Sequence, residues 1–248
     1  MQIIILAAGK GSRMNSALPK VMHEVAGVPM LERVVSNCKQ VTDDLVLVYS
    51  EPLEPYLPMF ETRAKLVHQQ EQLGTAHAVY VAKDLFNNKD NIGVIYGDNP
   101  LITPDIIGGL FKHLQDTKSQ VVTLAFEFDQ PNQYGRIILD SNNDFIRIVE
   151  SKFATPLEEK ITLCNSGIMA FAPRILNKYI DLCVRVDNST LEKELYLTNI
   201  IEICALGGEK VSYYKSKDHE LVVGVNTQDE LASANSFMNN AIIQAKKI

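Results

Sequence analysis

The chain has 248 residues, of which 46% are hydrophobic, and a formal net charge of −6 with a sequence pI of about 5.4. This length and apolar content allow a large core, most simply as one α/β domain with a small appendage. The acidic balance argues against a general nucleic-acid-binding surface, so an anion site must be a local concentration of Lys and Arg.

Targeting and redox signals are weak throughout the sequence. No stretch is long and apolar enough to span a membrane, and no basic leader precedes the first strand, so we expect a cytoplasmic protein without a membrane partner. The four cysteines contain no C-x-x-C pair, and the five histidines show no ligand spacing. We therefore expect buried, reduced thiols rather than disulfides or a zinc site.

The first twenty residues join a buried strand to a basic loop. The apolar run Ile3–Ala8 is typical of a parallel strand that is covered on both faces. The loop that follows contains Gly9, Lys10, Gly11, Arg13 and Lys20. Its backbone N–H groups and cations suit a phosphate chain, although the spacing matches neither the Walker loop nor the dinucleotide fingerprint. The alternative is a tight strand-to-helix turn with solvated charges.

Helical and strand patterns then alternate. Residues 30–39 have helical periodicity, and residues 45–49 and 65–68 predict a second and a third strand. Between these two strands, Pro52, Pro55 and Pro58 predict a surface connection.

The polar stretch Gln69–Val79 enters a helix. Thr75 is a suitable N-cap for a helix that we expect to run to about Phe86. Gly74 would allow a planar ligand to approach the backbone, and glutamine amides can pair with the donors and acceptors of a base edge. The alternative is a polar loop that simply precedes a capped helix.

The predicted strand at residues 91–96 ends close to Asp98. A carboxylate at the carboxyl tip of a parallel strand lies where open α/β sheets bind ligands, and its oxygens suit Mg²⁺. The alternative role of Asp98 is turn formation before Pro100. Thr103 and Pro104 predict the N-cap and first position of the next helix.

The second half begins with a predicted strand at residues 121–128. Residues 134–140 and 145–150 flank a turn, and we interpret them as a hairpin flap over the ligand edge of the sheet. A strand at residues 165–171, a helix ending at Gly207–Gly208 and a strand at residues 210–214 follow.

The last predicted helix starts at a capping box formed by Thr227 and Glu230 and runs to Lys246–Lys247. Asn226 lies just before this helix. That position suits either a structural turn or an amide ligand to a cation.

A series of short blocks covers nearly the whole chain. They are Leu6–Met14 with Leu18–Val21, Gln69–Val79, Tyr96–Leu101, Tyr134–Ile137, Ile148–Glu150, Asn165–Gly167, Leu195–Thr198 and Gly224–Asn226. In this order, they resemble the uridylyltransferase domain of the bifunctional N-acetylglucosamine-1-phosphate uridylyltransferase/glucosamine-1-phosphate acetyltransferase family.

The resemblance implies a Rossmann-like α/β nucleotidyltransferase fold with a mixed, mainly parallel sheet, flanking helices and a small β-hairpin flap that binds sugar. It implies a nucleotidyltransferase domain at residues 1–226, with its sugar side at about 130–200, and a C-terminal helix at 227–248. The implied reaction converts UTP and N-acetylglucosamine 1-phosphate into UDP-N-acetylglucosamine, used in cell wall biosynthesis, and pyrophosphate. The implied cofactor is Mg²⁺.

The resemblance also assigns roles to residues by position. Leu6, Ala7, Ala8, Gly9, Gln69, Gly74 and Thr75 would bind the nucleotide. Arg13 and Lys20 would bind phosphates and act in catalysis. Tyr96, Gly135, Glu150 and Asn165 would bind the sugar, and Asp98 and Asn226 would hold the metal.

The residue chemistry agrees with a direct transfer. Attack of a sugar phosphate oxygen on the α-phosphorus needs aligned reactants and stabilised charge but no protein nucleophile. Alternatives are a nucleotidyltransferase for another sugar phosphate or choline phosphate, with UTP or CTP, and a non-catalytic nucleotide-sugar sensor. A nicotinamide-dependent dehydrogenase is disfavoured because the glycine spacing is missing.

Departures from the family pattern lie on the sugar side and at the end of the chain. Phe153 and Asn199 stand where family members commonly have acidic residues, which leaves the identity of the sugar phosphate open. The hexapeptide repeats of the bifunctional enzymes are missing. We therefore expect neither acetyl transfer nor the trimer, but a monomer that binds small-molecule substrates.

Overall fold

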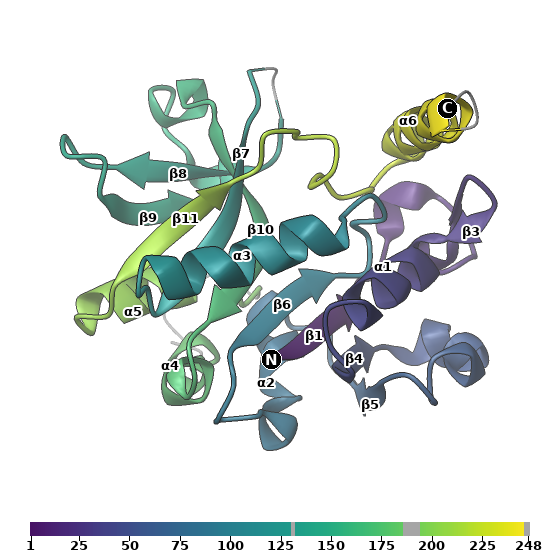
Figure 1. The fold of residues 1–248 in the computed structure, drawn as a ribbon, viewed down its shortest axis with the longest axis horizontal. Coiled ribbons are helices and arrows are strands. Elements are labelled where there is room, and N and C mark those ends of the chain that lie inside the picture. Colours follow the sequence, from purple (N-terminus) through teal and green to yellow (C-terminus); the bar gives the residue numbers. More distant parts are fainter. Residues whose placement is uncertain (130–131, 186–193, 246–248) are drawn as a thin grey trace.

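The fold is seen in a computed structural model that describes residues 1–129, 132–185 and 194–245. The strands of its main sheet are β1 (Gln2–Ala7), β4 (Asp44–Tyr49), β5 (Lys65–His68), β6 (Ile92–Tyr96), β7 (Val121–Glu127), β10 (Leu163–Phe171) and β11 (Val211–Lys215). They lie in the order β11–β7–β10–β6–β1–β4–β5 (Figure 1). A separate small hairpin consists of β2 (Glu24–Val25) and β3 (Val28–Pro29).

Parallel pairing brings the carboxyl ends of four strands to one edge of the sheet. β1 pairs in parallel with β4 and β6, and β4 pairs in parallel with β5. β10 runs antiparallel to both β6 and β7, and β11 runs parallel to β7. The predicted mixed, mainly parallel sheet is confirmed, and the carboxyl ends of β1, β4, β5 and β6 share one edge.

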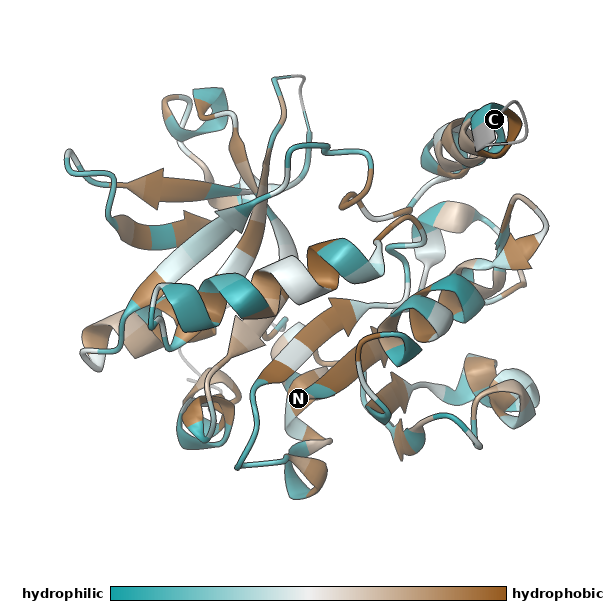
Figure 2. Ribbon diagram, in the orientation of Figure 1, coloured by the Kyte–Doolittle hydropathy of each residue, from teal (hydrophilic) through white to brown (hydrophobic). Residues whose placement is uncertain are grey.

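The helices cover both faces of this sheet. They are α1 (Met30–Lys39), α2 (Thr75–Tyr80), α3 (Pro104–Asp116), α4 (Ile175–Cys183) and α5 (Asn199–Leu206). The hydropathy colouring shows mainly hydrophobic β1 and β6 strands beside the mixed surfaces of α1 and α3 (Figure 2).

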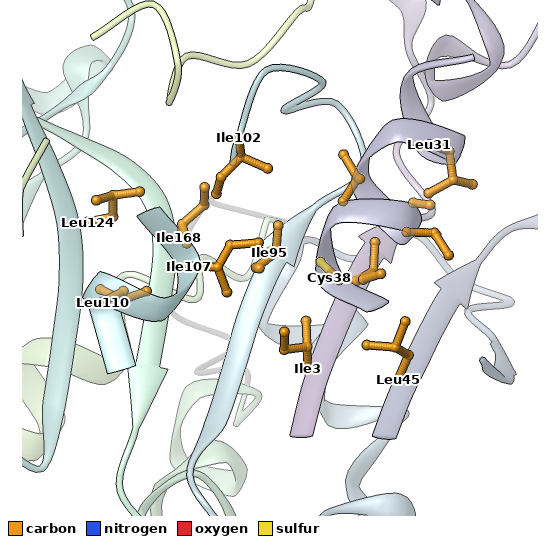
Figure 3. Packing of buried hydrophobic residues seen from close by; sticks show 14 of the residues in the cluster. Ile3, Leu31, Cys38, Leu45, Ile95, Ile102, Ile107, Leu110, Leu124 and Ile168 are labelled. Atoms are coloured by element: carbon orange, nitrogen blue, oxygen red, sulfur yellow. The ribbon is translucent and has the colours of Figure 1, made fainter. Parts of the chain in front are cut away.

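Successive side chains of β1 enter two different core layers. Ile3 and Ile5 belong to the cluster that contains α1 and α3 side chains, whereas Ile4 and Leu6 belong to the cluster with α2, α4 and α5. Figure 3 shows the first layer, in which Cys38 of α1 lies above the strands. This alternation follows from the two-residue period of a strand and explains why β1 has no polar face.

The predicted hairpin is formed by β8 (Gly135–Leu139) and β9 (Phe145–Val149), which pair antiparallel. β8 also pairs with β10, so that Gly135 lies opposite Asn165. The hairpin therefore extends from the β10 side of the sheet (Figure 1). The predicted sugar-side region, 130–200, contains residues 130–131 and 186–193, which lie outside the described residues.

The last helix, α6 (Gln228–Ala245), starts at the predicted capping box. The backbone N–H of Glu230 donates to Thr227 Oγ1 at 3.2 Å, and the backbone N–H of Thr227 donates to Glu230 Oε2 at 3.0 Å. Ala234 packs with Val25 and Met30 in a small third cluster. The predicted domain boundary thus falls at a helix start, and the predicted end at Lys246–Lys247 lies outside the described residues.

The helix predicted from Thr75 to about Phe86 is shorter than expected. α2 ends at Tyr80, and the chain continues with a 3-10 turn at Lys83–Leu85. The N-cap is Gly74, and no side chain caps this helix. The prediction that Thr75 is the N-cap was wrong. Its hydroxyl does not cap the helix because it accepts a hydrogen bond from the distant Leu197 N–H, at 2.9 Å.

Other 3-10 segments are Ser12–Met14, Lys20–Met22, Glu51–Met59, Ser151–Phe153 and Glu158–Lys160. The proline-rich connection is thus a 3-10 segment, and its Leu53 is buried. Among the described residues, no helix has both the length and the apolar character needed to cross a membrane.

Candidate active site

Two adjoining cavities open along the carboxyl edge of the sheet, with volumes of about 830 and 770 Å³. Both are lined by Arg13, Thr75, Tyr96, Asp98 and Asn226. A site of this shape can hold two substrates whose reacting ends meet at the shared residues. We call the larger space the sugar-side cavity and the smaller one the nucleotide-side cavity.

The nucleotide-side cavity is lined by every residue predicted to bind the nucleotide: Leu6, Ala7, Ala8, Gly9, Gln69, Gly74 and Thr75. The two predicted cationic residues, Arg13 and Lys20, line it as well. The structure therefore brings these residues to one place. Their roles toward a ligand remain predictions.

Gly9 and Gly11 of the first loop differ in whether the surrounding structure requires a glycine. Gly11 has φ +62°, and a Cβ there would lie 2.7 Å from Lys20 Cβ, so glycine lets the loop pack against Lys20. A Cβ on Gly9 would meet no heavy atom within 4 Å. Gly11 thus serves chain packing, whereas no contact among the described residues requires glycine at position 9.

The glutamine segment is fixed against the first loop. Gln72 donates to the carbonyl of Ala8 at 2.7 Å. Gln69 is almost fully buried, and its amide nitrogen contacts the Gly74 carbonyl at 3.2 Å and His77 Nδ1 at 3.1 Å. When His77 Nδ1 carries no hydrogen, these contacts use both hydrogens of the Gln69 amide and leave its oxygen as the group that can accept from a base.

Lys20 joins the two predicted metal ligands. Its ammonium donates to Asp98 Oδ2 and, at 2.9 Å, to Asn226 Oδ1. The Lys20 and Asp98 side chains are only 12% and 16% exposed. Two oxygens from distant segments therefore converge on one cation.

The backbone keeps these two oxygens close. The Val225 N–H donates to the Asp98 carbonyl at 2.8 Å, and the Asn226 N–H donates to Glu230 Oε2 at 2.6 Å. The start of α6 thus sets the position of Asn226 beside β6.

The donor set fits Mg²⁺. Mg²⁺ takes oxygen ligands and is usually held by one or two protein groups plus phosphates and water. Asp98 and Asn226 supply one carboxylate and one amide oxygen beside the cations of Arg13 and Lys20. The described residues contain no cluster of three or more His, Cys, Asp or Glu side chains suited to a metal.

The sugar-side cavity is lined by all four residues predicted to bind sugar: Tyr96, Gly135, Glu150 and Asn165. Asn165 Oδ1 accepts from Thr123 Oγ1 at 2.5 Å and from the Gly167 N–H at 3.1 Å. The amide NH₂ of Asn165 is consequently the group available to a ligand. Glu150 Oε1 accepts from Thr198 Oγ1 at 2.6 Å.

Tyr96 stands between the two cavities. Burial, followed by the carboxylates of Glu150 and Asp98, raises the pKa of Tyr96 above its ordinary value. Its hydroxyl therefore remains protonated and can donate a hydrogen bond.

Arg13 lies at the rim of the sugar-side cavity, where its guanidinium donates to Gln133 Oε1 at 2.7 Å.

Sequence reasoning missed several lining residues. Thr198 and Tyr196 lie in the recognised block Leu195–Thr198, and Gln72 lies in the glutamine stretch, so their signal was present but carried no assigned role. Phe237 of α6 had no such signal because only tertiary packing brings it to the cavity.

The two departures from the family pattern lie beside the site. Neither Phe153 nor Asn199 is among the described residues that line the cavities. Phe153 is half exposed, and the Lys152 ammonium lies 4.6 Å from its ring centre and 4.9 Å from that of Tyr196. Asn199 is the first residue of α5.

Comparison with known sequences identifies the family. Residues 3–152 match the MobA-like NTP transferase domain. The chain belongs to this family. It is therefore classified as a nucleotidyltransferase, in agreement with the two-cavity site.

Individual relatives extend the match to nearly the whole chain. The bifunctional protein GlmU of Alkaliphilus metalliredigens is 35% identical over 245 residues, covering 98% of this chain and 53% of the relative. The bifunctional protein GlmU of Zymomonas mobilis is 39% identical over 243 residues, covering 96% of this chain and 53% of the relative. The resemblance to the bifunctional family is confirmed, and the chain spans about half the length of these relatives.

A solved structure supports the fold. A putative glucose-1-phosphate thymidylyltransferase from Bacillus anthracis superposes with a TM-score of 0.72 at 21% identity, covering 96% of this chain and 94% of that one. At this identity the likeness shows the architecture alone, which is the Rossmann-like α/β nucleotidyltransferase fold expected from the sequence.

Proposed function

We propose that the protein is a Mg²⁺-dependent uridylyltransferase that makes UDP-N-acetylglucosamine and pyrophosphate from UTP and N-acetylglucosamine 1-phosphate. One observation carries this proposal: two cavities meet at Arg13, Asp98 and Asn226, where a nucleotide and a sugar phosphate would present their phosphates. The similarity to GlmU proteins supports the choice of substrates.

The shared residues suit in-line attack on the α-phosphorus. The site has to hold the attacking phosphate oxygen opposite the pyrophosphate leaving group, which is a task of alignment. Arg13 and Lys20 would bind phosphate oxygens and stabilise the charge that develops on them. Asp98 and Asn226 would hold Mg²⁺, which supplies Lewis-acid charge neutralisation when bound.

The residues of the sugar-side cavity suit the uncharged, hydroxyl-rich ring of a sugar phosphate. Glu150 offers a carboxylate acceptor and Asn165 an amide donor, while the Tyr96 hydroxyl lies between the cavities. A ring with several hydroxyls and an acetamido group can pair with both kinds of group.

The decisive experiment measures pyrophosphate release with UTP and Mg²⁺ in the presence of N-acetylglucosamine 1-phosphate, glucose 1-phosphate or glucosamine 1-phosphate. We expect clear preference for the first. Turnover with another phosphate substrate, including choline phosphate, would support the proposed reaction type but show that the proposed sugar phosphate is wrong. Absence of turnover with all acceptors and with both UTP and CTP would favour the nucleotide-sugar sensor.

We also propose that the chain works as a monomer in the cytoplasm. Residues of a single chain line both cavities, so the proposed chemistry requires no second copy. Sedimentation velocity should give the mass of one chain, and a stable dimer or trimer would contradict this assignment.

A further inference from the structure

The segment Leu195–Thr198, which we call the strap, lies against the turn that carries Gly74 and Thr75. The Leu195 N–H donates to the Leu73 carbonyl at 2.7 Å, and the Ala76 N–H donates to the Leu195 carbonyl at 2.8 Å. Two backbone hydrogen bonds therefore tie the strap to both ends of the Gly74–Thr75 turn.

Gly74 permits this contact. It has φ +120°, and a Cβ there would lie 2.5 Å from the Leu195 carbonyl oxygen and 2.6 Å from its nitrogen. These are backbone atoms, which cannot move aside as a flexible side chain can. The absence of a side chain at Gly74 thus has a reason inside the protein, in addition to any approach of a base.

The hydroxyl of Thr75 extends the link. It accepts from the Leu197 N–H at 2.9 Å. The structure therefore uses the Thr75 hydroxyl to hold the strap, although its position in the sequence suggests a nucleotide contact.

The other end of the strap reaches Glu150. Thr198 donates to Glu150 Oε1 at 2.6 Å, which fixes one carboxylate oxygen. The second oxygen, Oε2, lies 3.5 Å from the point that a Cβ on Gly135 would occupy. Thr198 thus orients the carboxylate beside a glycine of the hairpin, where a sugar hydroxyl can approach.

We propose that the strap is a positioning element of the sugar site, in which the Thr75 hydroxyl holds the strap through the Leu197 N–H and the Thr198 hydroxyl positions the Glu150 carboxylate. Neither hydroxyl needs to contact the reacting atoms. This inference rests on the proposed function, because it takes the sugar phosphate as the ligand of the sugar-side cavity.

Kinetics of Thr75→Val and Thr198→Val test the proposal. Each variant should raise KM for N-acetylglucosamine 1-phosphate about tenfold, the effect of one hydrogen bond to a charged or oriented group, while KM for UTP changes less than about twofold. Thr75→Ser and Thr198→Ser keep the hydroxyls and should restore KM. Thr117→Val removes a hydroxyl at the end of α3 that bonds to the His113 carbonyl and serves as the matched control.

The double variant provides a sharper test. If both hydroxyls act through one strap, their effects on sugar-phosphate KM are not independent, and the double variant should resemble the worse single variant. Effects that multiply would overturn the strap as a unit. A selective rise in KM for UTP in Thr75→Val would instead make Thr75 a nucleotide-binding side chain and overturn its proposed role.

Hydrogen exchange separates this proposal from the assigned reaction. The Leu197 amide should exchange faster in Thr75→Val than in the wild type, Thr75→Ser or Thr117→Val, whether or not the wild type turns over substrate. Unchanged exchange would overturn the link between Thr75 and the strap. A wild-type protein with protected Leu197 and no turnover would contradict the proposed function and leave the link itself supported.

Discussion

Lys20 shows how one side chain can organise a site that is built from distant segments. Its ammonium binds oxygens of Asp98, which follows β6, and of Asn226, which precedes α6. An isolated carboxylate removed from water is costly, so the cation stabilises Asp98 in this mostly buried position. Asp98 and Asn226 are also the proposed ligands of Mg²⁺, so the metal and the Lys20 ammonium would compete for the same oxygens. Asp98 carries the only charge of this pair and is therefore the most direct residue to test.

Replacing Asp98 by Asn should reduce metal-dependent turnover at least about 100-fold, because it removes the charged metal ligand and part of the electrostatic stabilisation. The measurement is pyrophosphate release over a range of Mg²⁺ concentrations. Asp116→Asn, at an exposed carboxylate paired with Lys112, is the control and should behave as wild type. Wild-type rates in Asp98→Asn would remove Asp98 from the proposed metal site.

Gln69 is the residue through which base choice can be tested. Its NH₂ lies against the Gly74 carbonyl and His77 Nδ1, so its oxygen is the group that we expect to accept from the N3–H of uracil. Gln69→Ala should therefore lower the ratio of UTP to CTP turnover more than it changes metal dependence. The exposed neighbour Gln70 provides the control, Gln70→Ala. An unchanged ratio in Gln69→Ala would exclude Gln69 from base selection.

At the scale of elements, the start of α6 connects helix capping to the site. Glu230 binds the backbone N–H groups of both Asn226 and Thr227, so the capping box and the loop that carries Asn226 share one carboxylate. Loss of the capping hydrogen bonds should consequently lower the stability of the fold and, to a smaller extent, change the position of Asn226.

Thr227→Ala should lower the free energy of unfolding by about 1 kcal/mol, the usual effect of removing an N-cap side chain. Urea denaturation measures this change. Thr227→Ser keeps the accepting oxygen and should retain most of the stability. A loss of the same size in both variants would show that the hydroxyl is not the stabilising group.

A second link between elements depends on pH. Arg63 donates to both carboxylate oxygens of Glu32 in α1, at 2.8 and 2.5 Å, and this hydrogen bonding holds the pKa of Glu32 below its ordinary value of 4.5. A carboxyl group with a lowered pKa stabilises the fold fully above its unfolded pKa and loses that contribution as the pH falls through the folded pKa.

Arg63→Met removes the ion pair and keeps an apolar stem near Phe60. We expect it to cost about 1 kcal/mol near neutral pH, a value that reflects partial solvent screening of the pair. The difference from wild type should shrink as the pH falls below 4.5. A difference that stays constant over this range, measured by urea denaturation, would assign the effect to packing.

At the scale of the whole molecule, the thiols report on the integrity of both core layers. Cys38 lies in the layer of α1 and α3, and Cys183 and Cys204 lie in the layer of α4 and α5. Burial raises the pKa of each of these three thiols to about 12. The expectation of buried, free cysteines is confirmed.

The native protein should therefore react slowly with a thiol reagent at about pH 8, because the reactive thiolate is scarce and inaccessible. All four cysteines should react at once in denaturant. Rapid labelling of Cys38 alone would indicate opening of the layer under α1, whereas rapid labelling of Cys183 and Cys204 would indicate opening under α4 and α5.

The sequence by itself determined the strands of the main sheet, the helix start at Pro104, the capping box at Thr227, and part of the set of residues that line the two cavities. Those features have local causes: apolar runs, caps, and glycines or carboxylates placed just after strands. Tertiary structure decided what these signals could not. The Thr75 hydroxyl, predicted to cap a helix, instead accepts a hydrogen bond from Leu197. Lys20 donates to Asp98 and Asn226, and Thr198 donates to Glu150. These contacts link segments far apart in the chain, and only the packing of the whole sheet brings their atoms within hydrogen-bond distance.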